Sequence, residues 1–193
     1  MPRSHMALMG YVGEAIVEYW LRWKYPVKDG FKIVSQIRPK AVPASGGPYL
    51  DFGVCRDGHI QYVYEVKGQD FIIDRSFAIN RSLVYIWTAN NDLGNFLSQD
   101  GDSFAAEDGL RALLVLLAPP NKDGMKKIGR ENLKNVILFA DIWEELGSLL
   151  TADQILRNLE ADLHVIIDIF KNPTAGRRLL PRFLKVRDSM QQN

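Results

Sequence analysis

Hydrophobic positions along the chain follow helical spacing in some segments and strand spacing in others. From Ala7 to Lys24, apolar residues recur every three or four positions on two sides of a helix. This helix ends before Tyr25-Pro26, because proline disfavours helical backbone in the residue before it. Apolar runs at Phe31–Arg38, Ala112–Ala118 and Asn135–Ala140 predict strands, and the last two are continuous enough to be covered on both faces.

The strongest strand pattern lies between Pro48 and Gln69. Two runs rich in Tyr, Val, Phe and Ile, Tyr49–Cys55 and Ile60–Lys67, flank the dipeptide Asp57-Gly58. Asp-Gly between apolar runs is a strong signal for a β-hairpin. We therefore expect two antiparallel strands here.

The remaining segments read as helices and one loop. The expected elements are a mostly helical segment Arg75–Ser98, a polar and acidic loop Gln99–Gly109, a helix Asp141–Gly147, an amphipathic helix that begins at Thr151, and a short basic helix Ala175–Ser189. The order of elements predicts an α/β fold with a central mixed β-sheet flanked by helices and a helical C-terminal extension. For that extension three roles stay open: forming a homodimer, covering the sheet, or holding substrate.

Three charged residues of the hairpin have no place in a purely structural strand pair: Asp51, Glu65 and Lys67. Glu65 and Lys67 are two residues apart and therefore share a face. A regular two-residue loop would set Asp51 opposite Tyr64, whereas a bulge or an odd loop would set it opposite Glu65. Two facing carboxylates repel each other unless a cation lies between them, and carboxylate oxygens are ligands that Mg²⁺ prefers. We therefore expect the bulged or odd-loop register and a metal site.

With these residues the chain resembles the PD-(D/E)XK nuclease superfamily, whose signature is an Asp near the start of one strand and Glu-x-Lys on the next. The matching positions are Asp51, Glu65 and Lys67, with Leu50 where the family motif has proline. The resemblance implies a restriction-endonuclease-like core. We assign 7–149 to this core, 150–193 to a helical extension of the same domain, and 1–6 to an expression-vector scar.

The resemblance also extends to the first helix and to the end of the hairpin. The run Gly10-x-x-Gly13-Glu14 is similar to the first helix of many members, in which a Glu approaches the metal and small residues let the helix lie close to the sheet. Gln69, just past the Lys, would orient a water or a phosphate. If helix follows the hairpin, Arg75, Asn80 and Arg81 would line the site from above.

The implied activity is a Mg²⁺- or Mn²⁺-dependent nuclease, with DNA cut internally as the leading expectation. Asp51, Glu65 and the carbonyl of Val66 would hold the metal, Glu14 would bind a second ion or order the metal's waters, and Lys67 would hold the attacking water or the phosphate oxygens. Two alternatives stay open: a catalytically silent member that binds nucleic acid or a protein, and a hairpin whose three charges simply face solvent.

Composition fits this picture without deciding it. The chain has 193 residues, 47% hydrophobic and 24% charged, and a net charge of +1, as expected for one globular domain. No segment approaches the ~18 apolar residues of a membrane span. The single cysteine, Cys55, rules out an internal disulfide, and we expect it to be buried in a strand. No signal peptide is apparent, so a reducing cytoplasm is the default expectation.

Other chemistries lack their motifs, and the charge distribution offers two places for nucleic acid to bind. There is no phosphate-binding glycine loop, hence no expected nucleotide cofactor, and no Cys/His cluster or nucleophile elbow. Basic residues gather in Asn121–Glu131 and near the C-terminus, where they are candidate contacts for phosphates.

Overall fold

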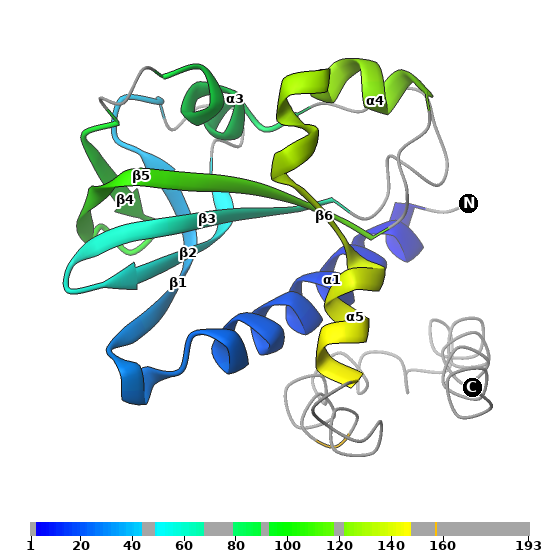
Figure 1. Ribbon diagram of the computed structural model, residues 1–193, viewed down its shortest axis with the longest axis horizontal. Coiled ribbons are helices and arrows are strands. Elements are labelled where there is room, and N and C mark those ends of the chain that lie inside the picture. Colours follow the sequence, from blue (N-terminus) through cyan, green and yellow to red (C-terminus); the bar gives the residue numbers. More distant parts are fainter. Residues whose placement is uncertain are drawn as a thin grey trace.

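The computed structural model describes residues 3–43, 49–67, 79–89, 93–117, 122–147 and 157. The described strands form one mixed sheet, in the order β3-β2-β1-β4-β5-β6 (Figure 1). The strands are β1 (Phe31–Pro39), β2 (Leu50–Arg56), β3 (His59–Lys67), β4 (Asn95–Ser98), β5 (Ser103–Leu116) and β6 (Val136–Leu138). The helices are α1 (Arg3–Lys24), α3 (Arg81–Thr88), α4 (Lys122–Ile128) and α5 (Phe139–Gly147), with short 3₁₀ turns at Val27–Asp29 and Arg130–Asn135. The expected α/β class is confirmed.

The β2–β3 hairpin has a two-residue turn and a bulge. Asp57 and Gly58 both have positive φ, 50° and 80°, as a tight hairpin turn requires. Arg56 pairs with His59, but the register then shifts, because Gln61 has no partner in β2. The bulged register expected from the sequence is therefore confirmed.

The pairings of five strands close into a ring. β5 runs parallel to β3, antiparallel to β4 and parallel to β6, while β4 also pairs with β1. The ring therefore passes through β1, β2, β3, β5 and β4, and β6 extends it at one side. Apolar residues of β5 point alternately to both sides, so Leu114 and Leu113 belong to different hydrophobic clusters.

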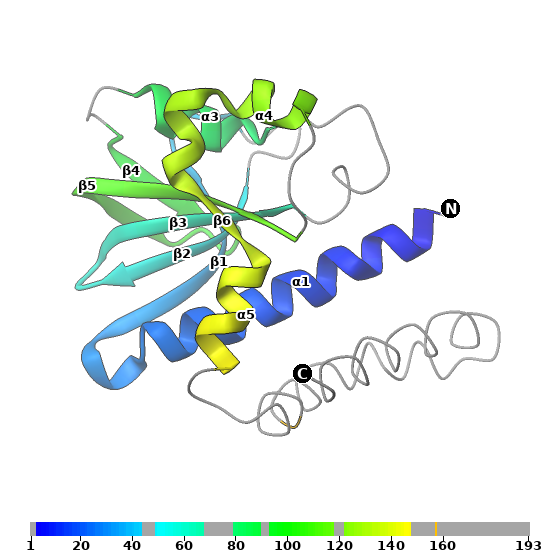
Figure 2. The ribbon, with the colours of Figure 1, turned by 45° about the vertical axis from the view of Figure 1, so that its right-hand side comes forward.

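Helices cover the strands from two sides. Figures 1 and 2 show α3 and α4 on one side and α1 and α5 on the other. Val17 and Leu21 of α1 pack with Phe52, Tyr64 and Val66. Leu83 of α3 belongs to the other hydrophobic cluster, the one that contains Leu114, and packs there with residues of β1, β2, β3 and β5. The two-sided apolar pattern of the first helix is thereby explained in part, because its buried stripe faces the sheet.

Helix α1 is tied to α5 as well as to the sheet. The indole Nε1 of Trp20 donates to Glu145 Oε2 at 2.9 Å, and Lys24 Nζ lies 2.9 Å from Glu145 Oε1. These contacts join the end of α1 to α5. They fix the helix that carries Glu14.

Several boundaries differ from the expectations. Residues 95–98 were expected to be helical but form β4, because their backbone pairs with both β1 and β5. The expected loop Gln99–Gly109 is wrong from Ser103 onward, where β5 already begins. Ser103 is exposed while it pairs with Leu97, and the exposed Glu107 and Asp108 lie where the register shifts between the pairs Ile60–Ala106 and Tyr62–Arg111.

Other boundaries shift by a few residues. Helix α1 begins at Arg3, inside the segment assigned to the scar. The expected strand Asn135–Ala140 is shorter, and in the described part of the sheet it lies at the edge rather than in the centre. Cys55 is buried, as expected. The C-terminal helices lie outside the described residues, apart from Arg157, which is helical.

No helix in the described ranges combines the length and the apolarity that crossing a membrane requires.

Gly13 of α1 lies close to Leu117, the residue that follows β5. A Cβ on Gly13 would overlap the side chain of Leu117, whereas one on Gly10 would lie 4.0 Å from its nearest neighbour, Glu14 Oε1. Both glycines lie in the same helix, so alanine should add the same helix propensity of about 1 kcal/mol at each.

We therefore predict that Gly10→Ala raises the free energy of unfolding. The free energy of unfolding of Gly13→Ala should be lower than that of Gly10→Ala by about 1–3 kcal/mol, because Leu117 must move. Urea denaturation of both variants measures the difference. Equal stabilisation by the two substitutions would contradict the close packing of this helix.

Candidate active site

Asp51 stands opposite Glu65. The pairs Gly53–Val63 and Phe52–Tyr64 run toward this position, and one further step in the same register sets Asp51 across from Glu65. Asp51 Oδ2 accepts a hydrogen bond from the backbone N–H of Val66 at 2.7 Å. Burial raises the pKa of Asp51, and the hydrogen bond from Val66, the charge of Lys67 and the amide of Gln36 offset part of that rise.

Glu65 is a buried carboxylate, with only 2% of its surface exposed. Its Oε1 lies 2.7 Å from Lys67 Nζ, and its Oε2 accepts a hydrogen bond from Asn80 Nδ2 at 3.1 Å. Burial, followed by the charge of Asp51, raises the pKa of Glu65 to about 7, although Lys67 and Asn80 act in the opposite direction. The site therefore holds its carboxylates close together at an electrostatic cost.

Glu14 reaches the same place from α1. It is half-buried, and its pKa is raised to about 7, first by burial and then by the charge of Asp51, while Lys67 lowers it. Glu14 and Asp51 share the wall of a pocket of about 230 Å³. The rest of that wall is formed by Ala15, Glu18, Ser35, Gln36 and Phe52.

Lys67 supplies positive charge to all three carboxylates. Its charge lowers the pKa of Glu14, Asp51 and Glu65 alike. Its side chain is 30% exposed, whereas Glu65 is almost fully enclosed. The Lys67 side chain is thus more accessible to solvent than the carboxylate that it contacts.

Gln36 is the residue that the sequence pattern did not single out. It lies in β1 between Ser35, which pairs with Phe52, and Ile37, which pairs with Leu50, so it stands beside Asp51. Its φ of 50° is unusual for a non-glycine residue within a strand. Its carbonyl accepts the N–H of Gln99 at 2.9 Å. In the sequence it reads as an ordinary polar strand position, and only the pairing of β1 with β2 reveals its place.

Asn80, expected to line the site, does contact it. Its Nδ2 donates to Glu65 Oε2 and also to the carbonyl of Tyr49, at 2.7 Å. Its Oδ1 accepts the N–H of Ser82 at 2.9 Å and so caps α3. One amide therefore fixes the start of a helix, the approach to β2 and one carboxylate of the site.

The other expected residues divide into three groups. Arg81 is exposed on α3, and no contact with the carboxylates is found for it. Val66 takes part through its N–H, while the role expected for its carbonyl stays a prediction. Gln69 and Arg75 lie outside the described residues.

The residues present match a hard divalent cation in chemistry. Asp51, Glu65 and Glu14 offer carboxylate oxygens, the ligands typical of Mg²⁺ and Mn²⁺. In the described ranges, no three His, Cys, Asp or Glu side chains are gathered as a group able to hold a metal ion. Here the carboxylates are bound by the Val66 N–H, Lys67 and Asn80 instead. A cation that bound them would have to replace some of these contacts.

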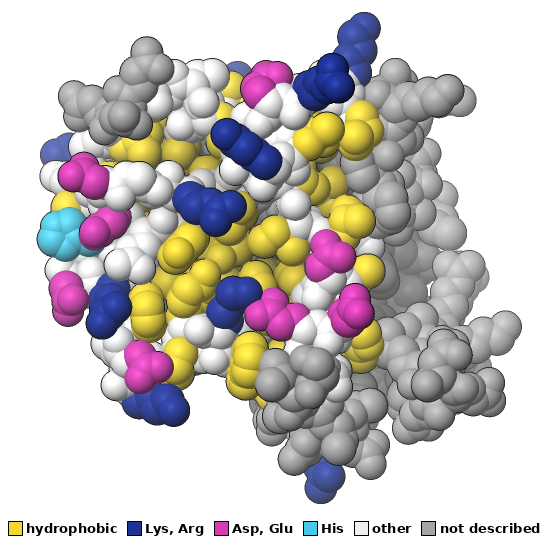
Figure 3. All heavy atoms as spheres, in the orientation of Figure 1, with side chains coloured by type: hydrophobic (Ala, Val, Ile, Leu, Met, Phe, Trp, Pro, Cys, Tyr) yellow, Lys and Arg dark blue, Asp and Glu magenta, His cyan; other side chains and the backbone are white. Residues whose placement is uncertain are grey.

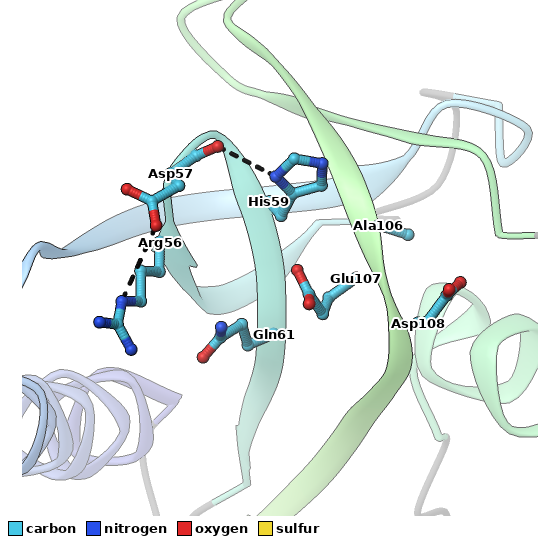
Figure 4. Close-up of a pocket in the computed structure, with 7 residues that line it drawn as sticks. All are labelled: Arg56, Asp57, His59, Gln61, Ala106, Glu107 and Asp108. Carbon is cyan, nitrogen blue, oxygen red and sulfur yellow. Dashed lines mark hydrogen bonds and ion pairs between the residues drawn. The ribbon is translucent and has the colours of Figure 1, made fainter.

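A larger hollow of about 530 Å³ lies at the turn end of the hairpin (Figure 4). Its lining mixes both signs of charge: Arg56, Asp57, His59, Gln61, Ala106, Glu107 and Asp108. His59 Nδ1 lies 3.0 Å from the carbonyl oxygen of its neighbour Asp57. None of the residues expected to be functional lines this hollow, so the candidate site is the carboxylate cluster at the other end of the hairpin.

Comparison of the chain with protein-family models, with curated proteins and with solved structures finds no match.

The raised pKa of Glu65 predicts a pH dependence of stability. The Glu65 carboxyl keeps its proton up to about pH 7 in the folded state but loses it near pH 4.5 in the unfolded state. The stability that this protonated group contributes is therefore fully present below pH 4.5 and is lost as the pH rises through 7. In EDTA, the wild type should therefore lose on the order of 2 kcal/mol relative to Glu65→Gln between pH 5 and 8. Urea denaturation at each pH tests this, and parallel curves for the two proteins would refute the assignment.

The amide of Gln36 is predicted to lower the pKa of Asp51. Gln36→Gly should raise that pKa, because it removes the amide while tolerating the positive φ. Asp57→Gly is the matched control, since Asp57 has the same φ of 50° but is exposed at the turn. Carbon-13 NMR of the Asp51 carboxyl in metal-free protein measures the pKa of Asp51 in both variants. A pKa of Asp51 that is the same in the two variants would show that Gln36 does not act on it.

Proposed function

We propose that this chain is a metal-dependent nuclease of the PD-(D/E)XK kind, which hydrolyses phosphodiester bonds of nucleic acid, with internal cutting of DNA as its activity. The observation that supports it best is the meeting of Glu14, Asp51, Glu65 and Lys67, which come from one helix and two strands. Carboxylates that face each other across a buried strand pair cost stability, and a fold retains such a cost at a functional site.

Each residue has a role in this proposal. Asp51 and Glu65, with the carbonyl of Val66, would hold Mg²⁺ or Mn²⁺, and Glu14 would bind a second ion or order the metal's waters. When bound, the metal supplies Lewis acidity and a water of lowered pKa. Lys67 leaves Glu65 and holds the attacking water or the phosphate oxygens, for which its partly exposed ammonium is well placed.

Gln36 and Asn80 support the carboxylates from outside the hairpin. Asn80 donates to Glu65, and Gln36 acts on Asp51, so each metal-binding carboxylate is oriented by an uncharged amide. Such donors hold a carboxylate in place without competing with the metal for charge. Glu65 is enclosed, so among the described residues the pocket that Glu14 and Asp51 line is the opening through which a ligand would reach the cluster.

The test compares one chemical change at two ends of the hairpin. Plasmid, linear duplex and single-stranded DNA, and RNA, are incubated with wild type, Asp51→Asn and Asp57→Asn in Mg²⁺, Mn²⁺ or EDTA. We expect cutting by the wild type and by Asp57→Asn only with metal, and a loss of roughly 10²- to 10³-fold or more in Asp51→Asn. Asp57 is exposed at the turn, so its substitution leaves the carboxylate cluster intact.

The contrary outcomes are equally specific. If Asp51→Asn cuts as fast as the wild type, the activity comes from a contaminant or from another site. If the wild type cuts none of these substrates and calorimetry shows no binding of Mn²⁺, the catalytic proposal fails. A protein that then still binds the oligonucleotides would be the silent nucleic-acid-binding member of the same family.

A further inference from the structure

Arg38 is a charged side chain that forms no ion pair with the residues that the structure describes. It is half-buried near the end of β1, and its Nε is buried without a hydrogen-bond partner. The ion pairs found in the described part of the chain do not include it. A guanidinium cannot lose its proton, so its charge remains whatever the surroundings. A partly buried charge of this kind is normally matched by an anion.

The guanidinium of Arg38 is held in place by neutral groups. Its Nη1 donates to the carbonyl of Val42 and, at 3.4 Å, to that of Pro39. Its central carbon lies 5.5 Å from the centre of the Tyr49 ring. These contacts orient the planar group, and none of them comes from an anionic side chain of the described residues, which is the arrangement of a preformed anion site.

This site lies next to the carboxylate cluster. The pairing of Ile37 with Leu50 sets Arg38 beside Tyr49, two residues before Asp51. The carbonyl of Tyr49 accepts from Asn80 Nδ2, the same nitrogen that donates to Glu65. A strand that places one phosphate at the cluster would therefore carry another close to Arg38. On the face that Figure 3 shows, both basic and acidic side chains are present among the described residues.

We propose that Arg38 binds a phosphate of the nucleic-acid strand that enters the candidate active site. The proposal rests on the proposed function for its ligand, but the binding itself needs neither metal nor hydrolysis. The rigid fork of Arg38 binds phosphate oxygens, and Tyr49 keeps the fork oriented. The competing explanation is that Arg38 only holds the turn at Pro39 and Val42.

The first test is a matched loss of charge. Arg38→Gln and Lys40→Gln each remove one positive charge at the end of β1, but Lys40 is exposed. Binding of a short labelled single strand and its duplex is measured by fluorescence anisotropy in EDTA. We expect Arg38→Gln to weaken binding roughly tenfold and Lys40→Gln no more than about twofold. Equal effects of the two substitutions would overturn the proposal.

A second measurement does not depend on a variant that folds. Dimethyl phosphate, a small phosphodiester, is titrated into the wild type while the Nε–Hε signal of Arg38 is followed by NMR. The signal should shift and saturate, and inorganic phosphate should compete for the site. If Arg38→Gln does not fold, Arg38→Lys keeps the charge, and its weaker binding of dimethyl phosphate would show that the planar fork matters. An Arg38 signal that does not shift at any dimethyl phosphate concentration in the titration would overturn the proposal.

These outcomes separate the two proposals. If the wild type cuts DNA and Arg38→Gln binds it normally, the anion site fails and the nuclease stands. If no DNA is cut but dimethyl phosphate shifts the Arg38 signal, the anion site stands without the nuclease. If neither result is obtained, both fail.

Discussion

The structure of the candidate site depends on one extra residue in a hairpin. Gln61 is unpaired in β3, and the resulting shift moves Asp51 from the position opposite Tyr64 to the position opposite Glu65. Because side chains alternate along a strand, a register change of one residue exchanges the two faces of the partner strand. The same shift pairs Phe52 with Tyr64 in the cluster under α1. Hydrophobic burial thus fixes the register that brings the carboxylates together.

The consequence is a cluster with more negative than positive charge in a poorly solvated place. Burial raises the pKa of Glu14, Asp51 and Glu65, and one ammonium, that of Lys67, acts on all three. Uncharged donors also stabilise the carboxylates of Asp51 and Glu65 by hydrogen bonds. These donors are Asn80, the amide of Gln36 and the backbone N–H of Val66. These donors come from different elements of the fold. The charge balance of the site is therefore a property of the whole sheet rather than of the hairpin.

The parts that the sequence predicted are those with local causes. The hairpin, the end of α1 at Lys24 and the buried run within β5 follow from periodicity and turn chemistry, all readable within a few residues. The bulged register was expected from the metal site that Asp51 and Glu65 would form if they faced each other. β4 and the first half of β5 pair with each other across a short turn, but they were missed because the four residues of β4 show no apolar alternation and its place beside β1 depends on a strand distant in sequence. Gln36 was missed for the same reason, since only the pairing of β1 and β2 brings it to Asp51. Its backbone conformation has no signature in the sequence.

Closure of the strand ring has a kinetic consequence. The parallel pairing of β3 with β5 joins His59 to Ala105, whereas the β2–β3 hairpin is local. Non-local pairing costs loop-closure entropy and forms late in folding. On an isolated hairpin, the carboxylates of Asp51 and Glu65 would still be hydrated, and they would repel each other strongly only after α1 and β5 had covered them. Their repulsion therefore shortens the lifetime of the native protein more than it slows its formation.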